Sequence, residues 1–309
     1  MEDFEMSYIR QFLPALLALL LPISSLQAAP FLHKIQTKRA PVSTCMAIAQ
    51  NLNNPLYQQH VSFAKFETSP QFGPRKIADF TFDSNETRAL TPFEVRIGYF
   101  DHSTYVIESA DGITAATDYF GWASYKGEGL IPTIVTMNKA HMSHFTASPD
   151  PRIEYILPGW GQTNPAKHFL QVQDMLVRNV TTDIIRGAFR EEDANSIFIF
   201  EVAGLCIGHL GHLHHPLVDA HYAQIGRLDV VMVPIDGALT LSLGGMAEIL
   251  KRLCARVILP MHARGFATPD TLISMLGDGF ESHYLGARSF ILSMSTLPRT
   301  PTVVVPLGL

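Results

Sequence analysis

The sequence predicts an α/β (α+β) protein in which β-sheets pack against each other and a few helices lie outside them. The order of the elements indicates this, because hairpins come first, a few helices and further hairpins follow, and a strand–helix–strand unit comes next. The apolar content agrees, since 47% of the 309 residues are hydrophobic and only 17% are charged. Such a chain can bury a sizeable core, which excludes disorder over most of its length.

The first half of the predicted domain consists of short runs rich in β-branched and aromatic residues, as is typical of strands. The expected strands cover residues 95–99, 104–108, 113–117 and 131–137. Asp111-Gly112 lies between the second and third of these runs and predicts a tight hairpin turn.

The second half continues with strands and adds two helices. The expected strands cover residues 174–180, 196–202, 205–210, 228–235, 257–260, 290–293 and 302–305. Residues 228–235 are almost continuously apolar, which predicts a strand buried on both faces. Residues 243–253 have helical spacing, and Thr268-Pro269 begins a second helix because a capping residue precedes proline.

The first 29 residues are expected to be a signal peptide. Residues 13–26 form an uncharged apolar run, shorter than the about 20 residues that span a bilayer, and Ala28-Ala29 follows as a small-residue cleavage site. This predicts a periplasmic or secreted protein that touches a membrane only through an uncleaved signal segment. An uncleaved anchor and a buried core helix are the alternatives, and a start at Met6 would leave Arg10 as the charge before the run.

Residues 30–91 have mixed composition and are expected to form an N-terminal lead-in segment with one short helix at 45–52, ahead of a main domain at 92–309. The net charge of −5 argues against a nucleic-acid partner, which would require clustered Lys and Arg. Cys45, Cys206 and Cys254 show no Cys-x-x-Cys spacing, and three cysteines are too few for a disulfide framework.

Histidines gather at the ends of three predicted strands. His141 and His144 follow the strand at 131–137, and His262 ends the strand at 257–260. The end of the strand at 205–210 carries a group of four, which consists of His209, His212, His214 and His215. Neutral imidazole is a common zinc ligand, and a catalytic zinc needs about three protein ligands and an open position. The pattern predicts a metal site, although each group taken alone also fits solvated loop histidines.

Side-chain directions limit which of the four can bind one ion. Residues 209 and 212 point to opposite faces of an extended strand, so both reach one ion only if the chain turns at Gly211. His214 and His215 are adjacent and point apart, so at most one of them contacts the ion. Some of the four are therefore expected to be structural.

Three segments resemble the metallo-β-lactamase superfamily. Gly98-Tyr-Phe-Asp-His-Ser-Thr-Tyr-Val-Ile-Glu108 resembles the opening segment of its ascorbate-6-phosphate lactonase-like and phospholipase D-like branch. Thr117-Asp118 resembles the first motif of that branch, and Leu259-Pro-Met-His262 resembles the segment with the last metal histidine. The resemblance covers residues 93–309 and implies a four-layer αββα sandwich. It also implies that Asp118 braces the metal loop without binding the ion.

Two signature motifs differ from those of the superfamily. Its His-x-His-x-Asp-His loop falls on Lys139, His141, Ser143 and His144. Its Gly-Asp pair, whose carboxylate bridges two metals, falls on Gly211-His212. Since imidazole rarely bridges two ions, we expect one zinc ion, or another divalent metal, rather than two. The ammonium of Lys139 would then replace the missing cation, with a solvated surface charge as the alternative.

The residues expected to bind the metal are His141, His144, His209, His212 and His262. Lys139 and Asp183 are expected to be catalytic, and Asp183 or His141 would serve as base, because the hydroxyl of Ser143 is too weak a base. Structural or supporting roles are expected for His102, Asp118, Ser143 and His215.

The expected function is hydrolysis of a small-molecule ester, lactone or phosphodiester by metal-activated water. The alternative is a degenerate, non-catalytic relative that binds a small molecule or a partner in the old active-site cleft, and the changes at Lys139 and Ser143 favour it. A serine hydrolase is disfavoured, because the chain contains no Gly-x-Ser-x-Gly motif.

Overall fold

A computed structural model of the chain describes residues 42–46, 82–84, 87–124, 129–139, 141–263 and 268–309, which lie in one unit that begins at residue 41. The predicted signal peptide at 1–29 lies outside the described residues, as do most of the lead-in segment at 30–91 and most of the helix expected at 45–52. Among the described residues, no helix combines the length and apolar character needed to cross a bilayer.

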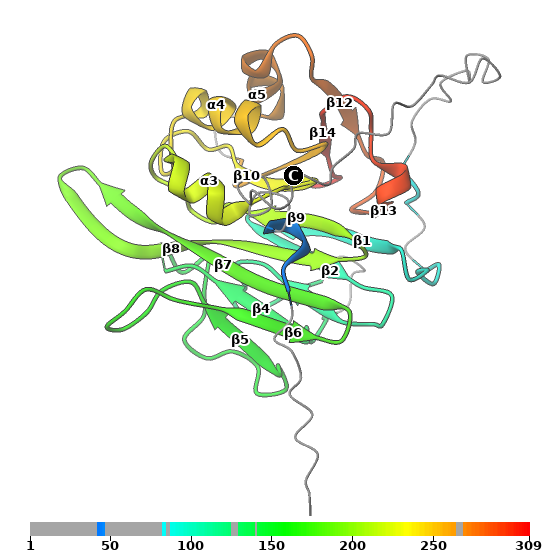
Figure 1. Cartoon of the computed structure of the whole chain (residues 1–309), viewed down its shortest axis with the longest axis horizontal. Coiled ribbons are helices and arrows are strands. Elements are labelled where there is room, and N and C mark those ends of the chain that lie inside the picture. Colours follow the sequence, from blue (N-terminus) through cyan, green and yellow to red (C-terminus); the bar gives the residue numbers. More distant parts are fainter. Residues whose placement is uncertain (1–41, 47–81, 85–86, 125–128, 140, 264–267) are drawn as a thin grey trace, which may run out of the picture. The chain divides into compact units, whose positions relative to one another are not determined.

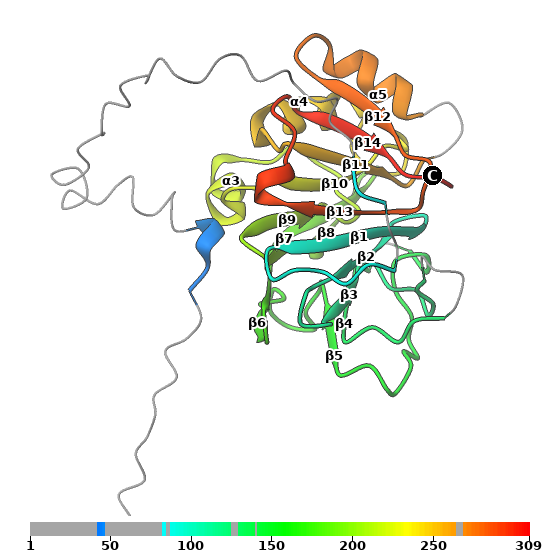
Figure 2. The ribbon, with the colours of Figure 1, turned by 90° about the vertical axis from the view of Figure 1, so that its right-hand side faces the viewer.

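Two sheets form the centre of this unit (Figures 1 and 2). The first has six strands in the order β13-β1-β2-β3-β4-β5. Their bounds are β13 (Ser289–Ser293), β1 (Glu94–Asp101), β2 (Thr104–Glu108), β3 (Thr114–Ala116), β4 (Ile134–Met137) and β5 (Tyr155–Pro158). Strands β13, β1, β2 and β3 pair antiparallel, whereas β3, β4 and β5 run parallel.

The second sheet has eight strands in the order β12-β14-β11-β10-β9-β8-β7-β6. Their bounds are β12 (Glu281–Tyr284), β14 (Thr302–Val305), β11 (Val257–Met261), β10 (Val230–Pro234), β9 (Leu205–His209), β8 (Phe189–Val202), β7 (Met175–Arg186) and β6 (Phe169–Val172). Strands β6 to β9 pair antiparallel, and β9, β10, β11, β14 and β12 run parallel. The carboxyl ends of β9, β10 and β11 therefore meet at one edge, where α/β sheets commonly bind ligands.

The core between the two sheets follows the two-residue period of the strands. Val230 and Met232 of β10 face the first sheet, and Val231 and Val233 face the helices on the other side. Every residue of β10 is buried, because both faces of the strand are covered. The continuous apolar run of the sequence at 228–235 is therefore explained.

The helices pack on the outer face of the eight-stranded sheet. They are α3 (Asp219–Ile225), α4 (Leu243–Leu253) and α5 (Pro269–Leu276), whereas the short 3-10 helix η1 (Met294–Thr296) follows β13 and buries none of its residues. Helix α4 buries Met246, Ile249 and Leu250 along one stripe, and Ser242 caps it by accepting from the backbone N–H of Gly245. In the described part of the chain, the outer face of the six-stranded sheet is covered by loop side chains such as Tyr119 and Ile153.

Strong local patterns gave accurate element boundaries. Strands 104–108 and 302–305 and helix 243–253 have the predicted bounds, and the second helix begins at Pro269 after the predicted Thr268 cap. The prediction missed β5, β6, β12 and α3, which are short and partly exposed, so that no apolar period marks them. The packing of two sheets with helices outside is confirmed.

Cys45 and Cys206 form one disulfide, although three cysteines are too few for a framework of several. The two residues are 161 positions apart, so their pairing could not be seen in the spacing. Beside the disulfide, the buried carboxylate of Glu201 accepts a hydrogen bond from the hydroxyl of Ser43 at 2.6 Å and from Arg178 Nε at 2.8 Å. Residues 42–46 are thus attached to the sheet by a disulfide and by hydrogen bonds to a buried carboxylate.

Replacement of Glu201 by alanine is expected to lower the free energy of unfolding by about 3–5 kcal/mol, because it leaves the buried guanidinium of Arg178 without its counter-charge. Urea denaturation measures this. Glu248→Ala removes an exposed ion pair with Lys251 and is the control, for which little change is expected. Equal effects of the two substitutions would show that the buried pair does not stabilise the fold.

Candidate metal centre

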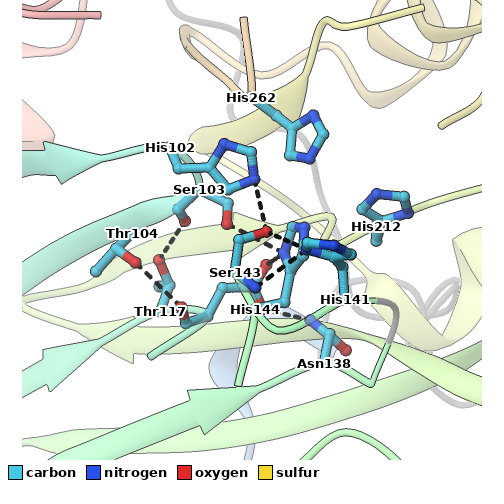
Figure 3. A network of polar contacts seen from close by, with 12 residues as sticks. His102, Ser103, Thr104, Thr117, Asn138, His141, Ser143, His144, His212 and His262 are labelled. Atoms are coloured by element: carbon cyan, nitrogen blue, oxygen red, sulfur yellow. Dashed lines mark hydrogen bonds and ion pairs between the residues drawn. The ribbon is translucent and has the colours of Figure 1, made fainter. Parts of the chain in front are cut away.

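Four imidazoles converge at the edge where the parallel strands end (Figure 3). His144 follows β4, His212 follows β9, and His262 follows β11 directly. His102 lies in the turn between β1 and β2, and its carbonyl accepts the backbone N–H of His262 at 2.7 Å. This bond ties the edge of the first sheet to the end of a strand in the second sheet.

His144 is the most deeply placed of the four. Its side chain is fully buried, and its Nδ1 lies 2.6 Å from Asp118 Oδ2. Its Nε2 has no hydrogen-bond partner among the described residues. A buried imidazole nitrogen without a partner is costly. A metal ion bound at Nε2 would satisfy it, and the donor set at this point fits such an ion.

Asp118 fixes the ring of His144 and is itself well satisfied. The carboxylate also accepts from Asn138 Nδ2 at 2.7 Å. Burial alone would raise the pKa of Asp118, but the charges of His144 and His209 and the hydrogen bonds from His144 and Asn138 lower that pKa to about 2. The carboxylate therefore stays ionised and holds the Nδ1–H of His144, which leaves Nε2 as the ligand atom.

His262 has a similar carboxylate neighbour. Its Nδ1 lies 3.3 Å from Asp236 Oδ1, close but not aligned for a hydrogen bond. Burial would raise the pKa of Asp236, but its interactions with His262 and with the hydroxyl of Thr240 hold the pKa well below its usual range. Asp236 was not among the predicted site residues. Its position directly after the predicted buried strand at 228–235 was the feature of the sequence that could have identified it.

Nitrogen distances identify one triad. One ring nitrogen each from His102, His144 and His262 lies within 4.8 Å of the others. His102, for which the sequence predicts a supporting role, is therefore close enough to be a candidate ligand, and its place in a turn hid this proximity.

Ring distances identify a second triad that shares two members with the first. The ring centres of His144, His212 and His262 are 4.7, 5.1 and 5.2 Å apart. A zinc ion about 2.0–2.1 Å from each nitrogen would place ring centres roughly 5 Å apart in a tetrahedral arrangement. The ring centres of His102 and His262 are 4.0 Å apart, and their planes are tilted by 44°. The spacing of the ring centres fits His144, His212 and His262, whereas the nitrogen distances group His102 with His144 and His262.

Ser143 links two further imidazoles at the cavity. Its hydroxyl oxygen lies 2.9 Å from His102 Nε2 and 3.2 Å from His141 Nδ1. His141 is exposed and also accepts the backbone N–H of Ser143 at 3.3 Å. The position that the superfamily loop gives to a carboxylate therefore carries a hydroxyl engaged with histidines.

Two residues expected to be catalytic lie elsewhere. Lys139 pairs with Glu191, and its side chain is 46% exposed. Asp183 pairs with Arg190 and accepts the backbone N–H of Asp193 at 2.9 Å. Neither residue lines the cavity. Each residue forms an ion pair with a residue of the β7–β8 hairpin, and these pairings could not be predicted from the sequence.

Two of the expected histidines are held by the backbone. His209 Nε2 donates to the carbonyl of Ser103 at 2.8 Å, and its Nδ1 accepts from Gly211 at 3.1 Å. His215 Nε2 accepts the backbone N–H of Asp183 at 3.1 Å. His209 therefore offers no free nitrogen to an ion. The chain does turn at Gly211, where φ is +59° and an added Cβ would come within 2.5 Å of Asn138 and Asn195.

A cavity of about 650 Å³ opens at the imidazoles. Its polar wall includes His102, His141, Ser143, His212, His214 and His262. Phe120, Ile185 and Leu239 form apolar parts of the wall, and Arg186 adds a guanidinium. The volume suits a small-molecule ligand.

Backbone strain gathers at this edge. His102, Asp118 and His262 have φ values of 51°, 41° and 57°, in the left-handed region that side chains rarely adopt. Such strain persists where the surrounding structure imposes it, and it is common at functional sites.

Comparison with known proteins identifies the family. Residues 96–262 match the protein-family model described as "Beta-lactamase superfamily domain", and the chain belongs to this family. The predicted superfamily is thereby confirmed, and its fold is that of metal-dependent hydrolases; the lactonase-like and phospholipase D-like branch stays a prediction.

One solved structure supports this fold, and a second is reported for comparison. A Thermotoga maritima protein assigned to the Zn-dependent hydrolases of the metallo-beta-lactamase superfamily is 25% identical, with a TM-score of 0.50 over 69% of this chain and 98% of that one. A metal-dependent hydrolase assignment from Parabacteroides distasonis is 14% identical, with a TM-score of 0.47 over 60% and 89%. No curated protein sequence matches the chain.

The metal-free protein is expected to become less stable as the pH is lowered, because of His209. Burial lowers the pKa of His209 below its ordinary value of 6.5, and a proton on Nδ1 would displace the N–H of Gly211. The unfolded chain takes up this proton first as pH falls below about 6.5, so the free energy of unfolding decreases. Thermal unfolding with chelator at about pH 7.5 and about pH 5 measures this.

His209→Gln lacks the titrating group and is the matched control. We expect this variant to be less stable at both pH values but to show a smaller difference between them. An unchanged difference would contradict the role assigned to His209.

Proposed function

We propose that the chain is a metal-dependent hydrolase that holds one zinc ion and acts on a small ester, lactone or phosphodiester. The observation that carries the proposal is the buried Nε2 of His144, which has no partner among the described residues and lies where the other imidazoles converge. Membership of a superfamily of metal-dependent hydrolases supports it.

His144 and His262 belong to both triads and would hold the ion, with His212 or His102 as the third ligand. When bound, zinc lowers the pKa of a coordinated water to roughly 7 and polarises the bond to be cleaved. Asp118 supports the ligand function of His144, since it keeps the proton of that ring on Nδ1.

His141 is placed to donate a hydrogen bond at the cavity. Its Nδ1 accepts from the backbone of Ser143, so the neutral ring carries its proton on Nε2. This N–H can donate a hydrogen bond to an oxygen of a substrate in the cavity that His141 lines. Phe120, Ile185 and Leu239 would bind the apolar part of a substrate, and Arg186 would orient an anionic group.

A non-catalytic binding protein is the second candidate. The hydroxyl of Ser143 occupies the loop position where the superfamily has a carboxylate. Lys139 lies outside the site and pairs with Glu191. Both observations weaken a two-metal mechanism, but they do not remove the ligands of a single ion.

Elemental analysis of purified protein is expected to find about one zinc per chain. Chelator should abolish hydrolysis of chromogenic esters or phosphodiesters, and His144→Ala and His262→Ala should lose the metal, because each removes a ligand shared by both triads. His283→Ala, in strand β12, is the control that keeps the metal.

Two zinc ions per chain would contradict the single-ion site. Chelator-resistant hydrolysis would contradict a metal mechanism. Stoichiometric zinc without hydrolysis of any substrate class would support the binding protein.

We also propose that the chain is exported to the periplasm or the extracellular space. The disulfide between Cys45 and Cys206 supports this, because disulfides persist in oxidising compartments. The apolar run at 13–26 supports it from the sequence.

Fractionation of cells that express the full chain tests export. We expect a mature protein that begins near Pro30 outside the cytoplasm, with Cys45 and Cys206 oxidised and Cys254 free. The Cys45→Ser, Cys206→Ser double variant should lose about 2–4 kcal/mol of stability, whereas Cys254→Ser should lose little. A cytoplasmic protein with an intact N-terminus and three free thiols would refute the proposal.

A further inference from the structure

A chain of two imidazoles connects the metal centre to the backbone of strand β7. His212 Nδ1 lies 2.7 Å from His214 Nε2, and His214 Nδ1 lies 2.6 Å from the carbonyl oxygen of Ile185. His212 is buried, and His214 is partly buried and lines the cavity. Neither contact was visible in the sequence, where His214 and His215 were indistinguishable.

The direction of this chain follows from its last member. A carbonyl oxygen can only accept, so His214 Nδ1 must carry a proton and donate it to Ile185. The neutral ring of His214 then has a lone pair on Nε2, which accepts from His212 Nδ1–H. His212 Nε2 is consequently left with a lone pair.

Neutral imidazole is the form that binds metal. In the neutral state, the two hydrogen bonds fix which nitrogen of each ring carries the proton.

We propose that His214 is a positioning residue that sets the tautomer of His212, so that His212 Nε2 completes a three-imidazole site with His144 and His262. This inference rests on the proposed metal function. Ring centres of these three residues at 4.7–5.2 Å support the ligand set. An all-imidazole set favours zinc, cobalt, nickel or copper over magnesium and calcium, which prefer oxygen ligands.

The same chain links the ion to the cavity wall. Ile185 lines the cavity together with its neighbours Arg186 and Gly187. The hydrogen bond from His214 therefore couples the orientation of a metal ligand to the hairpin between β7 and β8 that encloses the substrate space.

Zinc affinity, measured by competition with a chromophoric chelator, tests the proposal together with the visible absorption of the cobalt-loaded protein. His214→Phe removes the acceptor for His212 Nδ1–H and is expected to weaken zinc about 10–100-fold and to alter the cobalt spectrum. His214→Gln restores an acceptor near the position of Nε2 and should recover most of the affinity. His215→Gln changes the adjacent imidazole, whose Nε2 accepts from Asp183, and should leave both readouts unchanged.

Unchanged zinc affinity and cobalt spectrum in His214→Phe would overturn the inference, while loss of zinc in His144→Ala would leave the proposed function standing. Absence of zinc binding in the unaltered protein would overturn both. Nitrogen-15 NMR of the unaltered, zinc-loaded protein gives a measurement that needs no variant. We expect protons on Nδ1 of both His212 and His214. A proton on Nε2 of His212 would refute the proposal that His214 sets this tautomer.

Discussion

A carboxylate shielded from water, Asp118, holds the Nδ1 proton of His144, and the arrangement of the metal centre depends on this hydrogen bond. It fixes the ring plane and leaves Nε2 as a buried lone pair that requires a partner. Asn138 stabilises the same carboxylate from the other side. The left-handed backbone at Asp118 shows that the fold accepts local strain to bring this carboxylate under the ring.

The other candidate ligands are oriented by different hydrogen-bond or charge partners. His262 faces Asp236, and His212 is held through His214 by a backbone carbonyl. A neutral imidazole brings no negative charge to the ion, unlike a bridging carboxylate. In the site proposed above, His212 would offset less of the repulsion between two cations than a carboxylate would, in keeping with the proposal of one ion.

Much of the centre could be predicted from residues at the ends of strands. His144, His212 and His262 were found because parallel strands deliver their carboxyl ends to one edge. His209 had the same kind of position in the sequence, but both its nitrogens are hydrogen-bonded, to Ser103 and Gly211. Lys139 pairs with Glu191, which lies 52 positions further along the chain on a hairpin. Such pairings depend on distances between segments, which no local pattern contains.

The sequence by itself determined the alternation that builds two packed sheets, the capped helices, and the histidine-bearing strand ends, because each is a local consequence of side-chain period and capping chemistry. Only the tertiary structure decided which imidazole nitrogens remain available. That choice depends on which acceptors, such as the carbonyl of Ile185 or the carboxylate of Asp118, lie within hydrogen-bond reach after the sheets have packed.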